Sequence, residues 1–295
     1  MKKIRCSIGV LAYNEEAIIG KLLNSLLNQE LSIAQIEEII VVSSASTDDT
    51  NAIVKEFSDK DKRIKLIAED ERRGKSAAIN NFIKNTNTDV LIIESADTIP
   101  AQNTIEKLVK PFTNEEIGMT GGRPKPINKA DNFIGYAVNL LWRLHHHMAL
   151  REPKIGEMAA FRKVFSQIPP ESAVDEASIE SIIRNKGYEI KYIPDAIIKN
   201  KGPENLTDFI KQRRRIAAGH RWLKKTEDYS VSSSNSKLLF YLTLEEILAN
   251  PLDIFKLFGV MSLEVYCRIL GYYDIEIRNK NPYKWEIANT TKHMD

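Results

Sequence analysis

The chain has 295 residues, of which 43% are hydrophobic and 28% are charged, a composition that can fill a core and that excludes disorder over most of the length. Its 42 basic and 40 acidic side chains leave a formal net charge of +2, so the overall charge gives no sign of a nucleic-acid-binding protein. The two cysteines, Cys6 and Cys267, fall in apolar patterns and are predicted to be buried and unpaired. No segment reads as a signal peptide or a membrane-spanning helix, so we expect a cytoplasmic chain.

Strand and helix patterns alternate over the first hundred residues. Strands are predicted at 4–10, 36–42, 63–67 and 90–93, where apolar residues alternate or β-branched residues run together. Helices are predicted at 18–27, at 74–84, and after Thr47, which is expected to cap a helix with Asp48 and Asp49 in its first turn. This order predicts the α/β class: a Rossmann-like, mainly parallel sheet with helices on both faces. Ligands of such sheets bind beyond the carboxyl ends of the strands.

The remainder of the chain is more mixed. Helices are predicted at 129–151, 175–185 and 206–225, and strands at 155–161 and 188–193. The serine-rich stretch 230–236 has the composition of a linker, and two apolar-rich helical segments, divided at Pro251, follow it. We therefore predict one domain over residues 1–229, with halves at about 1–100 and 101–229, and a helical C-terminal extension over 236–295.

Polar side chains follow three of the predicted strands at the point where each strand ends. The first strand leads into Tyr13-Asn14-Glu15-Glu16, the second into residues 43–50, and the fourth into residues 94–98. Each segment alone could be a helix cap or a turn. Because the carboxyl ends of parallel strands meet at one edge of a sheet, the three together predict a mouth lined by hydrogen-bonding groups.

Five segments, in order, resemble the signature of glycosyltransferase family 2. The first is the segment 7–50, in which an Asn-Glu-Glu turn at 14–16 is followed by the turn that contains Ser46-Thr47-Asp48. The second begins with Arg73-Gly74-Lys75, similar to a Gly-Lys helix start, and the third is Ser95-Ala96-Asp97, at the place of an Asp-x-Asp motif. The fourth and fifth are Asp175-Glu176 and Gln212 to Arg215, similar to the Glu-Asp and Gln-x-x-Arg motifs. The combination is specific, although each motif alone is weak.

The resemblance implies a GT-A-type fold and transfer of a sugar from a nucleoside-diphosphate donor, expected to be a UDP-sugar, to an acceptor hydroxyl or phosphate. The donor is expected to contact Ala12, Tyr13, Asn14, Glu15, Ser44, Asp48, Arg73, Lys75, Ser95, Ala96, Asp97, Gln212 and Arg215. The resemblance also implies Mn²⁺ or Mg²⁺ bound by Asp97, with His220 completing the metal shell. Ser95 replaces the first carboxylate of the motif. This departure weakens metal binding or shifts charge compensation to Lys75, Arg73 and Arg215.

Glu176 and Asp175 are the candidate catalytic residues. The resemblance implies an inverting reaction in which a carboxylate takes the acceptor proton, and the second acid of the pair, Glu176, holds that position. The alternative is that both acids favour a helix N-terminus. Glu157 is expected near the acceptor, or else is a paired surface acid. The run His145-His146-His147 is not expected to form a metal site, because consecutive helical residues point about 100° apart.

Two other functions stay open at this point. A nucleotidyltransferase also uses an α/β sheet, but it would usually show a Gly-rich phosphate loop after the first strand, where Tyr13-Asn14-Glu15-Glu16 stands instead. Ser95 and Ile216, which replace a family Asp and a family Trp, also permit a degenerate member that binds sugar nucleotides without catalysis.

The C-terminal extension allows two interpretations. Its apolar faces either pack on the domain or on a second copy of the chain, or they form an interfacial element at the inner face of the membrane. The second interpretation would bring the site to a lipid-linked acceptor. We expect a glycan or a lipid-linked acceptor, a role in polysaccharide or glycolipid biosynthesis, and no nucleic-acid partner.

Overall fold

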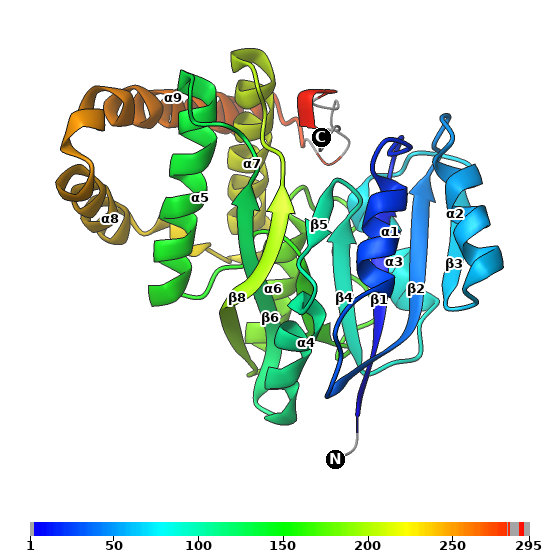
Figure 1. Cartoon of the computed structure of the whole chain (residues 1–295). Helices are drawn as coiled ribbons and strands as arrows, with labels where there is room; N and C mark the ends of the chain where they lie inside the picture. Colours follow the sequence, from blue (N-terminus) through cyan, green and yellow to red (C-terminus); the bar gives the residue numbers. More distant parts are fainter. Residues whose placement is uncertain (1–2, 282, 284–288, 292–295) are drawn as a thin grey trace.

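The computed structural model describes residues 3–281, 283 and 289–291 (Figure 1). Within these residues one eight-stranded sheet has the strand order β3-β2-β1-β4-β7-β6-β8-β5. The strands are β1 (Ile4–Ala12), β2 (Ala34–Ser44), β3 (Ile64–Glu69), β4 (Val90–Ser95), β5 (Thr98–Pro100), β6 (Ile117–Pro126), β7 (Ala159–Arg162) and β8 (Glu189–Asn200). The helices are α1 (Ile19–Leu27), α2 (Thr50–Lys60), α3 (Lys75–Lys84), α4 (Thr104–Val109), α5 (Phe133–Arg151), α6 (Asp175–Asn185), α7 (Leu206–Glu227), α8 (Ser236–Ala249) and α9 (Ile254–Tyr272).

The predicted alternation of strands and helices is confirmed in the first half of the chain. Strand β1 lies between β2 and β4 and is parallel to both, and β3 is parallel to β2. In the second half, β7 runs antiparallel between β4 and β6, whereas β6 and β8 are parallel. The carboxyl ends of β1, β2 and β4 therefore lie side by side at one edge of the sheet.

The β-branched run of β2 explains why helices cover both faces. Ile39 and Val41 belong to the core cluster that includes α1, whereas Ile40 and Val42 belong to the cluster that includes α3. All four side chains are at most 1% exposed. Successive side chains of β2 therefore point to opposite faces of the sheet, as in any strand. Both faces are covered by apolar core layers, as expected for a central strand of a parallel sheet.

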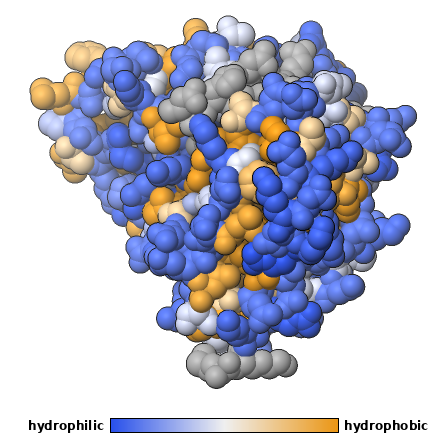
Figure 2. All heavy atoms as spheres, turned by 45° about the vertical axis from the view of Figure 1, so that its right-hand side comes forward, coloured by the Kyte–Doolittle hydropathy of each residue, from blue (hydrophilic) through white to orange (hydrophobic). Residues whose placement is uncertain are grey.

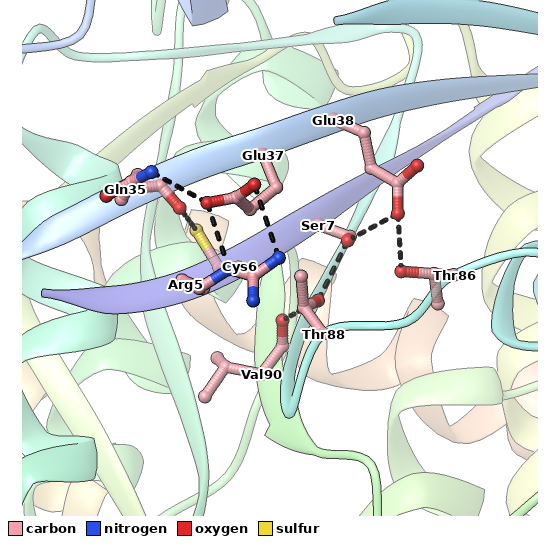
Figure 3. A network of polar contacts seen from close by, with 9 residues as sticks. All are labelled: Arg5, Cys6, Ser7, Gln35, Glu37, Glu38, Thr86, Thr88 and Val90. Atoms are coloured by element: carbon pink, nitrogen blue, oxygen red, sulfur yellow. Dashed lines mark hydrogen bonds and ion pairs between the residues drawn. The ribbon is translucent and has the colours of Figure 1, made fainter.

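A buried polar network joins β1 and β2 near the amino end of β1 (Figure 3). Ser7 donates to Glu38 at 2.9 Å, Thr86 donates to the same carboxylate at 2.9 Å, and Thr88 donates to Ser7 at 2.8 Å. Burial alone would raise the pKa of Glu38, but these hydrogen bonds and one from Lys65 outweigh burial and lower it. The charge of Glu38 is thus satisfied inside an otherwise apolar strand pair.

The second predicted helix begins later than expected. It starts at Thr50, not after a Thr47 cap, and no side chain caps it at Asp49. The carboxylate of Asp48 instead accepts hydrogen bonds from the Thr50 amide at 3.1 Å and the Thr50 hydroxyl at 2.6 Å. Asp48 thus closes a local turn before the helix. Aspartate side chains are suited both to such turns and to helix caps, and here the turn is formed.

The C-terminal helices complete a separate core cluster. Leu242 of α8 and Leu257 and Val260 of α9 pack with buried residues of α5 and α7. At Gly271 a β-carbon would lie 2.7 Å from the backbone nitrogen of Ala218, so α9 crosses α7 at close range. None of the described helices combines the length and the apolar character needed to cross a bilayer. The last part of the predicted 236–295 extension lies outside the described residues.

The serine-rich segment predicted as a linker is packed. It contains a short 3₁₀ turn, Ser232–Ser234, beside Val231, which is 3% exposed. Lys154 donates to the Ser233 hydroxyl at 3.0 Å. The segments on the two sides of residue 229 share core clusters. The predicted division of the chain near that residue stays a prediction.

Candidate active site

A cavity of about 900 Å³ opens beyond the carboxyl ends of β1, β2 and β4. Helices α3, α6 and α7 supply much of the rest of its wall. Its lining includes most of the residues predicted to bind the donor or to act on it: Ala12, Tyr13, Glu15, Ser44, Lys75, Ser95, Ala96, Asp97, Asp175, Glu176, Gln212, Arg215 and His220. Segments separated by about two hundred residues therefore meet at the edge where the sequence predicted the ligand.

Three predicted donor contacts lie outside this lining. Asn14 adopts a left-handed backbone, with φ of 53°, and its side chain accepts a hydrogen bond from the Thr47 amide at 2.8 Å. Asp48 also accepts from the Glu16 amide at 3.1 Å. Arg73 pairs with the buried carboxylate of Glu69 at 3.0 Å. Asn14 and Asp48 hold the turns that follow β1 and β2, and Arg73 anchors the segment before α3.

The neighbour of Arg73 reaches the cavity instead. The guanidinium of Arg72 stacks over the ring of Tyr13, 4.3 Å from its centroid, and both residues line the cavity. Sequence reasoning missed Arg72 because two adjacent arginines precede the Gly-Lys motif, and nothing in their order says which one faces inward. A stacked arginine and tyrosine form a flat, cationic wall that suits an aromatic base or a phosphate.

Lys75 and the pair Asp175-Glu176 form the central ion cluster. The Lys75 ammonium is 2.9 Å from a Glu176 oxygen and 3.4 Å from an Asp175 oxygen. Burial alone would lower the pKa of Lys75, but the charges of Glu176, Asp175 and Glu157 outweigh it and raise the pKa. Burial would likewise raise the pKa of Glu176, but Lys75 outweighs it and lowers the pKa. Glu176 is therefore held ionised inside the cavity.

The two acids of this pair differ in their surroundings. Asp175 is 2% exposed and accepts a hydrogen bond from the Ser76 hydroxyl at 2.8 Å, which ties α6 to α3. Burial raises the pKa of Asp175 in spite of the opposing charge of Lys75. Glu176 is less enclosed, with 18% of its side chain exposed. The better-hydrated and ionised member of the pair is therefore the one that the family resemblance put forward as the base.

A second group of acids faces this cluster. Burial, together with the charges of Asp97 and Glu176, raises the pKa of Glu157 to about 8. Burial also raises the pKa of Glu94, which Thr98 contacts through its hydroxyl and whose other oxygen is buried without a partner. Burial lowers the pKa of Arg215 in spite of the charges of Asp175 and Glu176. The donor end of the cavity is thus rich in carboxylates that repel one another.

Replacing Glu157 with glutamine should make thermal stability less dependent on pH. A free glutamate titrates at about 4.3, whereas folding raises the pKa of Glu157 to about 8. Between these values the folded state keeps a proton that the unfolded state has lost, so stability falls as the pH rises. We expect the melting temperature of the wild type to fall more steeply across this window than that of Glu157→Gln. The exposed Glu30→Gln is the matched control, and parallel curves for all three proteins would contradict the prediction.

His220 lies in a different electrostatic environment. Burial, with the positive charges of Lys154, Arg213 and Arg268, lowers its pKa well below the ordinary value. The three histidines at 145–147 also point to different places. His145 lines the cavity, His146 lies 2.9 Å from the Tyr192 hydroxyl through its Nδ1, and His147 is exposed. Among the described residues, no three His, Cys, Asp or Glu side chains converge on a point that could hold a metal ion.

Comparison with known proteins identifies the family. The sequence profile described as Glycosyl transferase family 2 matches residues 7–187. The chain belongs to this family. It is 26% identical over 274 residues to a poly-beta-1,6-N-acetyl-D-glucosamine synthase of Staphylococcus epidermidis, a match that covers 88% of this chain and 65% of that protein. The chain spans 57 to 65% of the length of the curated relatives it matches.

Solved structures agree with this assignment at the level of the fold. A mannosyltransferase from Pyrobaculum calidifontis in complex with GDP-Man and Mn²⁺ superimposes with a TM-score of 0.63 at 22% identity, covering 96% of this chain and 83% of that one. A glucosyl-3-phosphoglycerate synthase from Mycobacterium tuberculosis, with Mn²⁺, UDP and phosphoglyceric acid, superimposes with a TM-score of 0.53 at 19% identity, covering 75% and 78%. The predicted GT-A fold is confirmed.

Family membership answers one of the alternatives that the sequence left open. The matching profile is that of glycosyltransferases, which argues against a nucleotidyltransferase.

Proposed function

We propose that the chain transfers a sugar from a UDP-sugar to an acceptor with inversion at the anomeric carbon, using Glu176 as the base. One observation carries the proposal: Lys75, Asp97, Glu157, Glu176 and Arg215, from five separate segments, line one cavity at the carboxyl ends of the parallel strands. A ligand that brings both negative charge and a reacting carbon would use the cations and the acids together.

The nucleoside is assigned to the side of the cavity formed by Tyr13, Arg72 and Ser44. The Tyr13 ring and Arg72 offer a stacking wall, and the Ser44 hydroxyl is fixed by its hydrogen bond to Glu69 at 2.8 Å. The diphosphate would then lie toward Lys75 and Arg215, whose charges are now balanced by carboxylates. We take uridine as the base because a structural neighbour was solved with UDP, and GDP is the alternative to test.

The carboxylates of the cavity fit a divalent cation that is held partly by the donor phosphates. Mg²⁺ and Mn²⁺ are commonly held by one or two carboxylates together with substrate phosphates rather than by a complete protein cage. Burial and, after it, the charge of Asp97 raise the pKa of Glu157, and a cation between the two acids would relieve their repulsion. We assign the cation to these two acids and to the donor phosphates, where it would stabilise the leaving diphosphate. His220 is left out, because three cations act on it.

The chemistry of transfer follows from the placement of Glu176. The acceptor oxygen attacks the anomeric carbon on the side opposite the diphosphate, and its proton passes to the Glu176 carboxylate. The bond between the anomeric carbon and the donor oxygen breaks, and its electron pair leaves with the nucleoside diphosphate. Lys75 orients Glu176 through their 2.9 Å contact, and the diphosphate would share that ammonium when the donor binds.

UDP should raise the melting temperature of the protein, and more so with Mn²⁺, because a ligand that binds only the folded state stabilises it by mass action. Asp97→Asn should lose the Mn²⁺-dependent part of this shift. The matched control is Asp89→Asn, an exposed acid just before β4, at the opposite end from the cavity. A thermal-shift assay with UDP and GDP, with and without Mn²⁺, makes the measurement. The absence of any shift with either nucleotide would overturn the proposed donor site.

A further inference from the structure

The cavity does not end at the donor-binding residues. Its lining also includes Lys154, Arg213, His220 and Arg268, whose charges act on one another, and this group is called here the cationic compartment. Lys154 donates to the Ser233 hydroxyl at 3.0 Å, and Arg268 donates to the Ser233 carbonyl at 3.4 Å. These side chains come from α7, α9 and two connecting segments, so they converge only in the folded chain.

The acids near this compartment are already engaged. Glu180 accepts hydrogen bonds from the Ile155 amide at 2.7 Å and the Tyr229 hydroxyl at 3.0 Å. Glu264 forms a two-point ion pair with Arg213. No carboxylate of the described residues lies within 4.0 Å of a side-chain nitrogen of Lys154 or Arg268. Burial, with the charges of Arg213 and Arg268, lowers the pKa of Lys154 to about 8, against the opposing charge of Glu180. An anion placed here would remove this penalty.

Another part of the cavity wall is apolar. Helices α5, α8 and α9 contribute Leu141, Trp142, Met148, Leu239, Met261 and Val265 to it. Val265 is 55% exposed, so this apolar wall reaches the surface of the molecule. Met261, Val265 and Arg268 lie about one turn apart on α9, so the apolar wall adjoins the cationic compartment. The cavity thus combines acidic, cationic and apolar lining.

The surface where the apolar wall emerges is itself apolar. Phe255, Phe258, Val265, Tyr266, Ile269 and Tyr272 of α9 are all at least 50% exposed and recur at helical spacing, which places them on one stripe of α9. The opposite stripe, with Leu257, Val260 and Cys267, is buried. Helix α8 adds Phe240, Tyr241 and Leu248 to the exposed surface. Figure 2 shows hydrophobic atoms at the upper-left edge of the molecule, over these two helices. We call this surface the apolar face.

The acids of the C-terminal helices turn away from the apolar face. Glu246, Glu264 and Asp274 are buried and pair with Arg143, Arg213 and Arg214 of α5 and α7. The exposed Glu245 also pairs with α5, through Arg151. Negative charge therefore faces the rest of the protein, while large apolar side chains face outward. An exposed apolar surface of this extent is typical of an interaction site.

We propose that the acceptor is an amphiphile whose headgroup carries both a phosphate and the hydroxyl that attacks the donor. The phosphate binds in the cationic compartment, and the hydrocarbon chain follows the apolar wall to the apolar face. The neighbouring cationic and apolar linings match such a molecule: negative charge meets Lys154 and Arg268, and the chain leaves past Met261 and Val265 on the same helix as Arg268. A lipid phosphate in a membrane surface satisfies both requirements, because the apolar face can rest in the same interface that holds the lipid. This inference rests on the proposed function, and it names the acceptor class of that site.

Dodecyl phosphate below its micelle concentration is the first probe. It should raise the melting temperature more than inorganic phosphate or dodecanol at the same concentration, because head and chain bind together. Arg268→Gln should weaken this binding at least about fivefold, and Met261→Gln should reduce the advantage of the long chain. Lys237→Gln, an exposed charge on α8 outside the cavity, is the matched control and should behave as the wild type. Both Arg268 and Lys237 are exposed, so neither change threatens folding.

Vesicles provide the second arm. Phosphatidylcholine vesicles that contain a few per cent of a long-chain lipid phosphate should carry the wild type upward in a flotation assay more than vesicles of phosphatidylcholine alone, and Arg268→Gln should reduce the difference. Equal binding of dodecyl phosphate by the wild type and Arg268→Gln, or equal binding of inorganic phosphate and dodecyl phosphate, would overturn the proposal. The UDP shift should persist in Arg268→Gln. Loss of the UDP shift in the wild type would instead count against the proposed donor site.

Discussion

Replacing Glu176 with glutamine is expected to lower the turnover number for sugar transfer by roughly 10²-fold or more, while UDP binding changes little. The carboxylate is ionised because Lys75 outweighs the effect of burial on its pKa, and it stands inside the cavity with part of its surface open. Glutamine keeps the shape of the side chain but cannot accept the proton of the acceptor. The loss should therefore appear in turnover rather than in the UDP thermal shift.

Asp175→Asn is the matched comparison for this experiment. Asp175 is held by the Ser76 hydroxyl and is almost fully buried, so its replacement should lower stability and affect transfer less than Glu176→Gln. Initial rates of UDP release in the presence of acceptor, together with melting temperatures, separate the two effects. An inactive Asp175→Asn beside a near-normal Glu176→Gln would move the base to Asp175, and normal turnover in both would remove the assignment.

Replacing Arg213 with methionine should lower the free energy of unfolding by about 3 kcal/mol, because it leaves the charge of Glu264 buried and unpaired. The Glu264 side chain is only 8% exposed and the Arg213 side chain 25%, with a second contact of 2.8 Å between them. Methionine preserves the apolar stem of the arginine, so the change reports the lost charge rather than lost packing. Urea denaturation followed by circular dichroism provides the measurement.

Two variants test the reason for this effect. Arg213→Met with Glu264→Met should recover most of the stability, since an apolar pair of similar volume replaces a buried ion pair without penalty. Arg151→Ala removes an exposed partner of Glu245, with side chains 44% and 53% exposed, and should cost less than about 1 kcal/mol. Equal losses in the single Arg213 and Arg151 variants would mean that the α7–α9 pair is no stronger than a surface contact.

The residues at the strand ends could be predicted from the sequence to line the site. The partner of each individual charged side chain could not. Tyr13, Ser44 and Asp97 each follow an apolar strand, and the parallel order of β1, β2 and β4 brings them to one cavity. Asp48 was predicted to contact the donor, but short-range hydrogen bonds to the Thr50 amide and hydroxyl engage one of its oxygens. Local competition of this kind depends on backbone geometry that a motif does not specify.

The basic helix shows the same limit. The sequence offers three consecutive arginines as phosphate ligands, yet helical geometry separates them by about 100° each. Arg213 pairs with Glu264 and Arg214 with Asp274, both from the C-terminal helices, while Arg215 faces the carboxylates of Asp175 and Glu176. The periodicity alone could have shown that only one of the three faces the site. The partners of the other two lie about fifty to sixty residues further along the chain, beyond the reach of local patterns.

The convergence of Lys154 and Arg268 could not be predicted from local sequence patterns. They are 114 residues apart and meet at Ser233, in a segment whose composition indicated only a linker. Their convergence depends on the docking of α9 against α7 through the close approach at Gly271. The proposed acceptor side of the cavity is thus assembled by tertiary contacts, whereas the proposed donor side follows from the alternation of strands and helices.

The placement of three described residues has a practical consequence for engineering this protein. Tyr283 lies against Gly74, at the start of α3, and both Tyr283 and Thr291 line the cavity. The first described residues precede β1 at the opposite edge of the sheet (Figure 1). An affinity tag, fluorophore or surface tether joined before β1 would leave the cavity open to donor and acceptor. The same group attached to Tyr283 or Thr291 would lie against the cavity wall and compete with ligands for that space.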